Sequence, residues 1–523
     1  MSTRVEVSNR LVFINSASSL VTRLISMSVL IWLQRYLLKR ISADEYSLLP
    51  VLYSVMMFAP LITTVLTGGL GRYIVESYAK HDDRRITQIV STMFPILCAA
   101  GLAFMGLGCI LAWNVDHILR IEPEHLRDAR VMLALLMFTA AVRLPLAPFG
   151  VGLFVQQKFV LENLIGIGAE LFRLSLLFLL LFGVSTRVLW VVLASASAEL
   201  LNLALVQFFS RRMVPQLRVD RSLFHWPVAK EITAFGGWTF VAGLAATIRS
   251  SSDVLILNWF STPFQVAVFH LGQIPKNQFS ALSSQAKRTV LPVITSCFTT
   301  GRMDVVRRAF LRSSRYGLWA ASLPIIPGLV YGKNAFVYYL GPDYAVCALV
   351  MNVSMAVYLF AWPSLLTPEL AQAAKRVRTL ALNELTLNLV NLAITLLLVI
   401  HYSMGAIGSA TGTLIATMIF HPLLSWRLGM KLAQVSMRDM LRAVLLPGFA
   451  PGILHLVVLG AISLYCPQPT LLWLALLCIF GGIVHGAGVF AIGWWFEDPI
   501  CAVVIEKAKR VQGMARKRLG FGR

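Results

Sequence analysis

The sequence predicts an all-α polytopic membrane protein of about 14 transmembrane helices, with two six-helix lobes in a parallel pseudo-repeat and two extra C-terminal helices. Composition is the first observation behind this prediction. The chain is 57% hydrophobic and 13% charged, with a mean hydropathy of +0.73, whereas soluble domains carry about 25% charged residues. The second observation is a series of apolar runs of bilayer-spanning length, about 20 residues each. The third is an internal repeat.

The apolar runs define the expected transmembrane helices in chain order. They are continuous, which favours helices over the short alternating segments of a β-barrel. The first six are Leu11–Leu33, Tyr46–Gly69, Ile86–Trp113, Val131–Phe154, Val160–Phe182 and Val188–Phe209. The next six are Gly236–Phe260, Phe264–Cys297, Tyr316–Tyr338, Tyr344–Leu366, Leu380–Ile400 and Gly405–Trp426. The last two are Leu446–Tyr465 and Leu471–Trp494.

Two similar stretches indicate the repeat. RISADEYSLLPVLYSV begins at residue 40 and WFSTPFQVAVFHLGQI at residue 259, each after the first helix of a predicted lobe. An even number of helices separates the copies, so both have the same orientation in the membrane. We therefore expect an N-lobe at 1–210, a cytoplasmic linker at 211–235, a C-lobe at 236–430, two further helices at 431–496 and a basic cytoplasmic tail at 497–523.

The net charge of +22 is concentrated in short loops and in the tail. Loops after even-numbered helices are rich in Lys and Arg, whereas the later loops around Thr262, Ser403 and Gln468 carry none. The first and third loops are exceptions to this alternation. By the positive-inside rule, the pattern predicts a multi-pass protein with both termini in the cytoplasm. Charge placed there meets anionic lipid, so we expect no nucleic-acid partner.

The predicted seventh helix carries two charges near its middle, Arg249 and Asp253. They are four residues apart, so they share a helix face and can pair. A charge at the bilayer centre costs about 2.5–3.5 kcal/mol on insertion scales and usually faces a bundle interior or a wet cavity. The two charges form either a structural ion pair between helices or part of a polar translocation cavity.

Arginines recur inside other predicted helices. Arg23 lies in the middle of the first helix and has no acidic residue within one turn, and Arg143 lies in the fourth. A guanidinium binds phosphate bidentately and stays protonated, which favours a phosphate-bearing substrate. The alternative for Arg23 is a bond to an acidic side chain of another helix, namely Glu170, Glu199 or Asp253.

Other patterns concern packing and chemistry. Glu170 and Arg173 are three residues apart in the fifth helix, which predicts a structural ion pair. Glycine pairs at Gly408/Gly412, Gly448/Gly452 and Gly482/Gly486 predict close helix contacts. The sequence GGLGR at 68–72 lacks the strand and GK[ST] of a nucleotide loop. The histidines and cysteines lack metal-ligand spacing, so we expect no cofactor and no metal.

Five stretches carry a likeness to a known family: LLKRISADEYSLLPVLYSV, LTGGLGRYIVESYAKHDD, RSSSDVLILNWFSTPFQVAVFHLGQI, VLPVITSCFTTGR and YYLGPDY. With the helix count and spacing, they make nearly the whole chain resemble bacterial lipid-linked oligosaccharide (polysaccharide) flippases of the multidrug/oligosaccharide-lipid/polysaccharide exporter superfamily. The first loop departs from the usual pattern. Ser42-Ala43 stands where leucine-glycine is usual, and Ser47 stands at a commonly glycine position.

The resemblance implies a transporter, not an enzyme. It implies that the protein flips undecaprenyl-pyrophosphate-linked oligosaccharide across the bacterial inner membrane by alternating access, for exopolysaccharide, O-antigen or capsule biosynthesis. Arg23 and Arg249 match cavity-facing arginines of related flippases, and Asp253 and Glu170 are candidate carriers of a coupling ion. The expected partners are the lipid-linked glycan, membrane lipids, a polysaccharide polymerase and chain-length machinery.

Three other functions remain open. A multidrug extruder of the same superfamily would need an acidic cavity for cationic drugs. A peptidoglycan lipid-precursor flippase would share the helix count and the cationic cavity. A polysaccharide polymerase or ligase would carry a large periplasmic loop, but the longest outward connection, around Asn114 to Arg130, is short.

Overall fold

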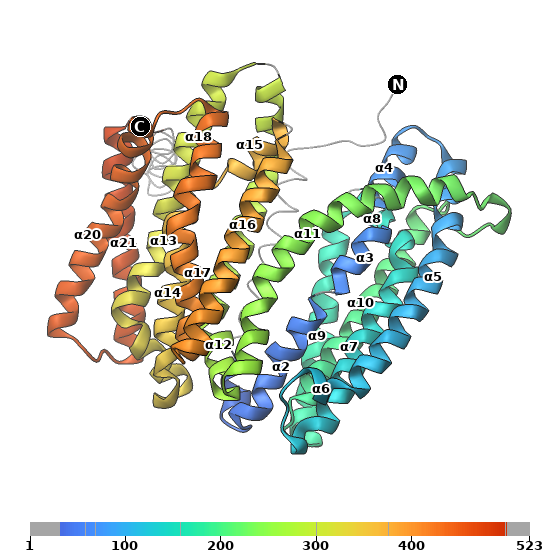
Figure 1. Ribbon diagram of the computed structural model, residues 1–523, viewed down its shortest axis with the longest axis horizontal. Helices are drawn as coiled ribbons and strands as arrows, with labels where there is room; N and C mark the ends of the chain where they lie inside the picture. Colours follow the sequence, from blue (N-terminus) through green and yellow to red (C-terminus); the bar gives the residue numbers. More distant parts are fainter. Residues whose placement is uncertain are drawn as a thin grey trace, which may run out of the picture. The chain divides into compact units, whose positions relative to one another are not determined.

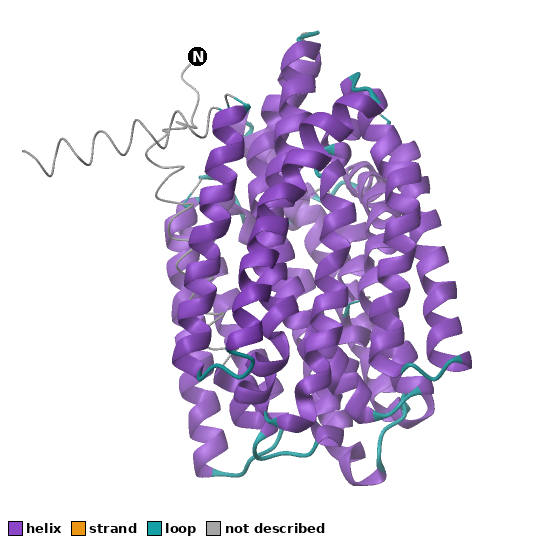
Figure 2. Cartoon of the chain, turned by 90° about the vertical axis from the view of Figure 1, so that its left-hand side faces the viewer, coloured by secondary structure: helices purple, strands orange, loops and turns teal. Residues whose placement is uncertain are grey.

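The computed structural model describes residues 32–57, 59–67, 70–156, 158–299, 301–374, 376–496 and 498. For a further set of helical residues, chiefly 234–250 and 282–293, it describes the backbone but not the side chains. Every regular element in the described part of the chain is a helix (Figure 2). The all-α class predicted from composition is therefore confirmed.

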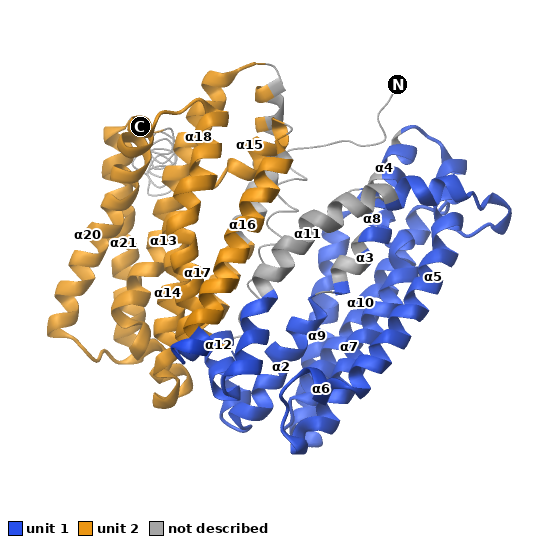
Figure 3. Ribbon diagram, in the orientation of Figure 1, with its two compact units in different colours: residues 1–270, 399–406 blue, residues 271–398, 407–523 orange. Residues whose placement is uncertain are grey.

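The chain divides into two compact units (Figure 3). Unit 1 comprises residues 1–270 and 399–406, and unit 2 comprises residues 271–398 and 407–523. The helices of unit 1 (Figure 1) are α2 (Ala43–Met56), α3 (Ala59–Thr67), α4 (Leu70–Ala79), α5 (Asp83–Trp113), α6 (Val115–Ile118), α7 (Leu126–Leu146), α8 (Val151–Val155), α9 (Phe159–Gly183), α10 (Leu189–Met213), α11 (Trp226–Phe260) and the first residues of α12 (Pro263–Thr299).

Unit 2 holds the rest of α12 and the helices that follow, except for residues 399–406, which belong to unit 1. These are α13 (Met303–Leu340), α14 (Val346–Ala361), α15 (Thr367–Ala373), α16 (Val377–Leu396), α17 (Gly405–Phe420), α18 (Arg427–Ala433), α19 (Met437–Met440), α20 (Leu446–Tyr465) and α21 (Leu471–Trp495). Short π-helical segments, Leu397–His401, His421–Trp426 and Leu441–Leu445, continue α16, follow α17 and precede α20.

Nine helical segments among the described residues are long and apolar enough to cross a membrane. They are Asp83–Trp113, Pro123–Val155, Val160–Gly183, Leu189–Met213, Pro342–Ala373, Arg378–His401, Gly405–Ala433, Met437–Tyr465 and Leu471–Trp495. They coincide with the third to sixth and the tenth to fourteenth predicted spans. The chain is thus a polytopic helical membrane protein.

Helix boundaries differ from the prediction where a helix continues beyond its apolar stretch. The predicted span from Gly236 belongs to α11, which begins at Trp226, and the span from Tyr316 belongs to α13, which begins at Met303. Hydropathy marks only the part of a helix that suits lipid, whereas backbone hydrogen bonding continues through polar residues. The predicted span 46–69 forms two helices, α2 and α3.

Close helix contacts in both units are made at glycines. A Cβ on Gly101 of α5 would lie 2.8 Å from the carbonyl oxygen of Ala141 on α7. In unit 2, a Cβ on Gly448 of α20 would lie 2.5 Å from a side-chain carbon of Leu318 on α13. Lipid is as apolar as leucine, so membrane helices associate largely through such backbone approach. These contacts fix α7 beside α5, and α20 beside α13.

Candidate functional site

A group of charged and polar side chains in unit 1 is built around α10. Ser195 and Glu199 lie one turn apart on this helix, so they occupy the same face. Helix α10 packs against α7 and also against α9. Each of these neighbours contributes an arginine, Arg143 from α7 and Arg173 from α9. We call the group formed by these residues with Glu170 and Tyr53 the α10 face.

Arg143 pairs with Glu199 across two helices. The Nη1 atom of Arg143 lies 3.5 Å from Oε1 of Glu199, and the two side chains are 70% and 41% exposed. A single long contact between exposed groups contributes little stability. The pair neutralises both charges while leaving the guanidinium open to another anion.

Arg173 is held more tightly. Its Nε and Nη2 atoms donate to the two carboxylate oxygens of Glu170, at 3.0 Å and 2.5 Å. Both residues lie on α9, and their side chains are 19% and 18% exposed. This bidentate geometry is the strong form of an arginine–carboxylate contact. It confirms the ion pair that the three-residue spacing predicts.

Tyr53 of α2 joins this group. Ser195 and Arg173 both lie close enough to the Tyr53 hydroxyl to interact with it electrostatically. The α10 face therefore receives side chains from α2, α7, α9 and α10. Sequence reasoning missed Tyr53, because a tyrosine in an apolar run is equally typical of a membrane interface. The only signal was its place inside the repeated stretch RISADEYSLLPVLYSV.

The remaining predicted site residues lie on other elements. Arg23 is outside the described residues, and for Arg249 the structure describes the α11 backbone without the side chain. Asp253, also on α11, is buried with 7% exposure, and α11 packs on α2 and α3. The predicted pairing of Arg249 with Asp253 stays a prediction.

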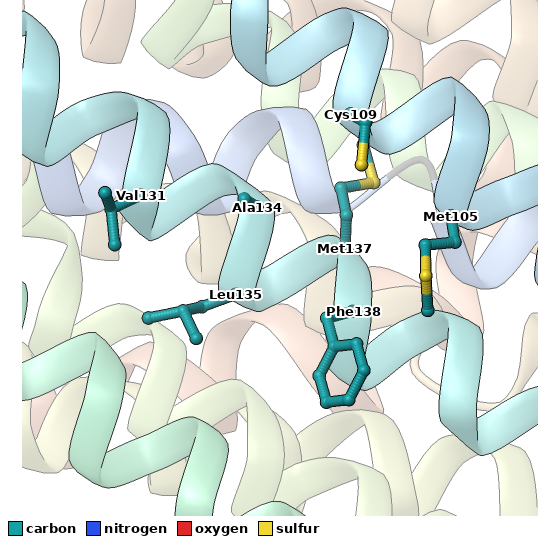
Figure 4. Close-up of a pocket in the computed structure, with 7 residues that line it drawn as sticks. All are labelled: Met105, Cys109, Val131, Ala134, Leu135, Met137 and Phe138. Carbon is teal, nitrogen blue, oxygen red and sulfur yellow. The ribbon is translucent and has the colours of Figure 1, made fainter.

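An apolar pocket lies apart from these charges, between α5 and α7 (Figure 4). Its volume is about 350 Å³, and its lining is Met105, Cys109, Val131, Ala134, Leu135, Met137 and Phe138. None of these side chains carries a charge. The pocket suits hydrocarbon, whereas the α10 face carries charged side chains that form ion pairs.

Comparison with known proteins defines the family. The model of the family described as "Polysaccharide biosynthesis protein" matches residues 9–298, which is more than half of the 523 residues. A search of proteins with curated function found no match.

Solved structures share the fold. The lipid II flippase MurJ in an inward closed conformation is similar over 92% of this chain and 99% of its own, with a TM-score of 0.69 and 13% identity. An inward-facing multidrug resistance MATE transporter of the MOP superfamily is similar over 80% of this chain and 95% of its own, with a TM-score of 0.63 and 12% identity. A MOP superfamily transporter from Pyrococcus furiosus is similar over 81% of this chain and 95% of its own, with a TM-score of 0.59 and 11% identity. Such identities indicate fold alone, and it is the sequence match that places this chain in the polysaccharide biosynthesis protein family.

Proposed function

We propose that this protein flips undecaprenyl-pyrophosphate-linked oligosaccharide from the cytoplasmic to the periplasmic leaflet of the bacterial inner membrane. The glycan would then serve exopolysaccharide, O-antigen or capsule biosynthesis, with a polysaccharide polymerase and chain-length machinery as downstream partners. The family match and the transporter fold support this function. The observation that carries it is the α10 face, because it offers guanidinium groups within membrane helices.

Arg143 is the described residue best suited to bind the pyrophosphate. Its partner Glu199 contributes one contact at 3.5 Å, and a pyrophosphate offers more negative charge and more acceptor oxygens in bidentate geometry. Arg173 would have to give up two shorter contacts to Glu170. Arg23 and Arg249 would complete the anion site from the first and seventh predicted helices.

Alternating access of the two predicted six-helix lobes would move the substrate, with both termini in the cytoplasm. Asp253 and Glu170 are the candidate carriers of a coupling ion. Asp253 is nearly enclosed in unit 1. Glu170 is neutralised by Arg173, so it would accept a proton only after Arg173 turns to the substrate. This order would link substrate binding to ion binding.

Two alternatives keep specific support. The fold shared with MurJ over 92% of the chain is also compatible with a peptidoglycan lipid-precursor flippase. The fold shared with MATE transporters is compatible with a multidrug extruder, and this alternative is supported by the α10 face, where each described arginine is balanced by a glutamate. These functions differ in the charge and head group of the substrate, so a substrate panel separates them.

The test is leaflet transfer in proteoliposomes containing the full chain. The panel consists of a lipid-pyrophosphate oligosaccharide, a peptidoglycan lipid precursor and a cationic dye. We expect transfer of the oligosaccharide lipid above that of protein-free liposomes and of the other two compounds. Transfer of the precursor alone, or of the dye alone, would replace the proposed function with the matching alternative.

A further inference from the structure

The C-terminal end of α11, which the predicted topology places on the outer side of the membrane and which we call its outer end, is held by a buried polar side chain. Asn258 lies near the C-terminus of this helix and is 7% exposed. Its Oδ1 atom accepts a hydrogen bond from the backbone N–H of Arg120 at 3.0 Å, and its Nδ2 atom donates to the backbone carbonyl of Arg120 at 3.1 Å. The amide thus satisfies both polar groups of one residue that lies 138 positions away.

The neighbouring residue makes a second attachment. Trp259 donates its indole N–H to the carbonyl oxygen of Ile118 at 2.8 Å. Ile118 and Arg120 belong to the connection 114–125 between α5 and α7. We call these three hydrogen bonds the Asn258 contact. All of its residues lie in unit 1.

The connection that receives Asn258 is itself fixed. Arg130 of α7 pairs with Asp116 at 3.2 Å, and its guanidinium lies over the ring of Trp113. Hydrogen bonds from its own backbone N–H and from Arg130 hold the pKa of the Asp116 carboxyl below its usual range, so the pair stays charged at neutral pH. The Asn258 contact therefore joins α11 to a connection that is itself tied to α5 and α7.

One further contact at this end joins the predicted halves of the repeat. The ring of Tyr46 on α2 lies 6.1 Å from that of His270 on α12. A further contact at this end lies within the predicted C-lobe, where the Oε1 atom of Gln265 on α12 accepts a hydrogen bond from the backbone N–H of Ala406 at 2.9 Å. Gly405 allows this approach, because its φ is +52° and a Cβ there would lie 2.6 Å from the Gln265 oxygen.

The other end of α11 is attached differently. It begins at Trp226, inside the predicted linker 211–235, and Glu231 in its second turn pairs with Arg85 of α5 at 3.0 Å on an exposed surface. The linker keeps this end close to the first half of the chain even when the ion pair breaks. At the outer end only non-covalent contacts join α11 to the connection 114–125.

We propose that the Asn258 contact is an outer gate, which holds α11 closed during inward access and breaks when the transporter opens outward. The proposal rests on the proposed alternating access. In the predicted repeat, the connection 114–125 belongs to the N-lobe and α11 begins the C-lobe, so outward opening must separate them. Hydrogen bonds between side chain and backbone can be broken and remade, unlike a covalent link.

The first test measures, without substrate, the distance between α11 and the connection 114–125. Spin labels are attached at Glu122→Cys and Thr262→Cys, two exposed positions beside the contact, in a variant lacking the seven native cysteines. Asn258→Ala is expected to raise the ratio of long to short label distances by roughly tenfold, because it loses two hydrogen bonds. Asn114→Ala is the matched control, since the Asn114 amide bonds only to the carbonyl of Ile110 on its own helix.

The second test keeps Asn258 and locks the gate. The same two cysteines are joined by a cleavable thiol crosslinker of the length found for the closed state. We expect crosslinking to stop leaflet transfer of lipid-pyrophosphate oligosaccharide and cleavage to restore it, whereas the Thr262→Cys protein treated alone keeps transferring. Full transfer by the crosslinked protein would overturn the gate, as would unchanged distances in Asn258→Ala.

The two tests separate the gate from the substrate assignment. The distance measurement needs no substrate, and the crosslink can be repeated with whichever compound of the panel is transferred. A gate that opens in Asn258→Ala while the oligosaccharide lipid is not transferred would leave the gate standing and remove the proposed substrate.

Discussion

At the scale of single residues, the difference between two ion pairs decides what the α10 face can do. Arg143 keeps one long contact to Glu199 and is largely exposed, whereas Arg173 makes two shorter contacts to Glu170. The first pair suits exchange with a ligand, because little is lost when it opens. The second suits support, because a bidentate pair in a membrane helix is costly to open.

Removing one partner of the tighter pair should therefore destabilise the protein. We expect Arg173→Met to lower stability by about 2–3 kcal/mol, because it leaves the Glu170 carboxylate without its cation. The double variant Arg173→Met/Glu170→Leu should recover most of this loss. Thermal unfolding in detergent measures both. A double variant as unstable as the single one would show that the pair stabilises through contacts other than its charge.

The sequence predicted the local pair but not the distant one. Glu170 and Arg173 share a helix, so their spacing alone brings them together. Arg143 and Glu199 are 56 positions apart, and their meeting depends on how α7 and α10 are rotated about their axes. Hydropathy does not determine that rotation, because the runs are apolar nearly all round. The place of Tyr53 beside this group could not be predicted either, because it depends on the rotation of α2.

At the scale of helices, glycines determine which neighbours approach most closely. The predicted pair Gly448/Gly452 does contact α13, with Leu318 and Ser322 within 3 Å of a hypothetical Cβ. In the pair Gly482/Gly486, neither glycine has a neighbour within 4 Å. A spacing of four places two glycines on one face, but it does not tell whether that face meets a helix in the same chain.

A matched pair of substitutions in α5 tests this role of glycine. We expect Gly101→Ala to destabilise the protein by about 1–3 kcal/mol, because its Cβ would meet the Ala141 carbonyl and α7 must move away. Gly106→Ala lies on the same helix with nothing within 4 Å, so it should be neutral or slightly stabilising. Equal melting temperatures for the two variants would contradict a close α5–α7 contact.

At the scale of the whole molecule, composition and hydropathy were enough to predict the fold class. Nine predicted spans recur as membrane-crossing helices in the described part of the chain. Helices α11, α12 and α13, of 35, 37 and 38 residues, contain the seventh to ninth spans and extend beyond them. The two compact units place α11 with the first half of the chain, so the lobes drawn from the repeat stay a prediction.

The claim that an arginine in the membrane binds the substrate pyrophosphate can be tested most directly by one comparison. Transfer of lipid-pyrophosphate oligosaccharide is measured in proteoliposomes for wild type, Arg143→Ala and Arg187→Ala. Arg187 is similarly exposed and pairs with Asp128 at 3.8 Å, but it lies just before α10 and outside the α10 face. We predict a loss of roughly tenfold or more for Arg143→Ala, the effect of one charged hydrogen-bonding partner, and a wild-type rate for Arg187→Ala. Equal rates for Arg143→Ala and wild type would contradict the account.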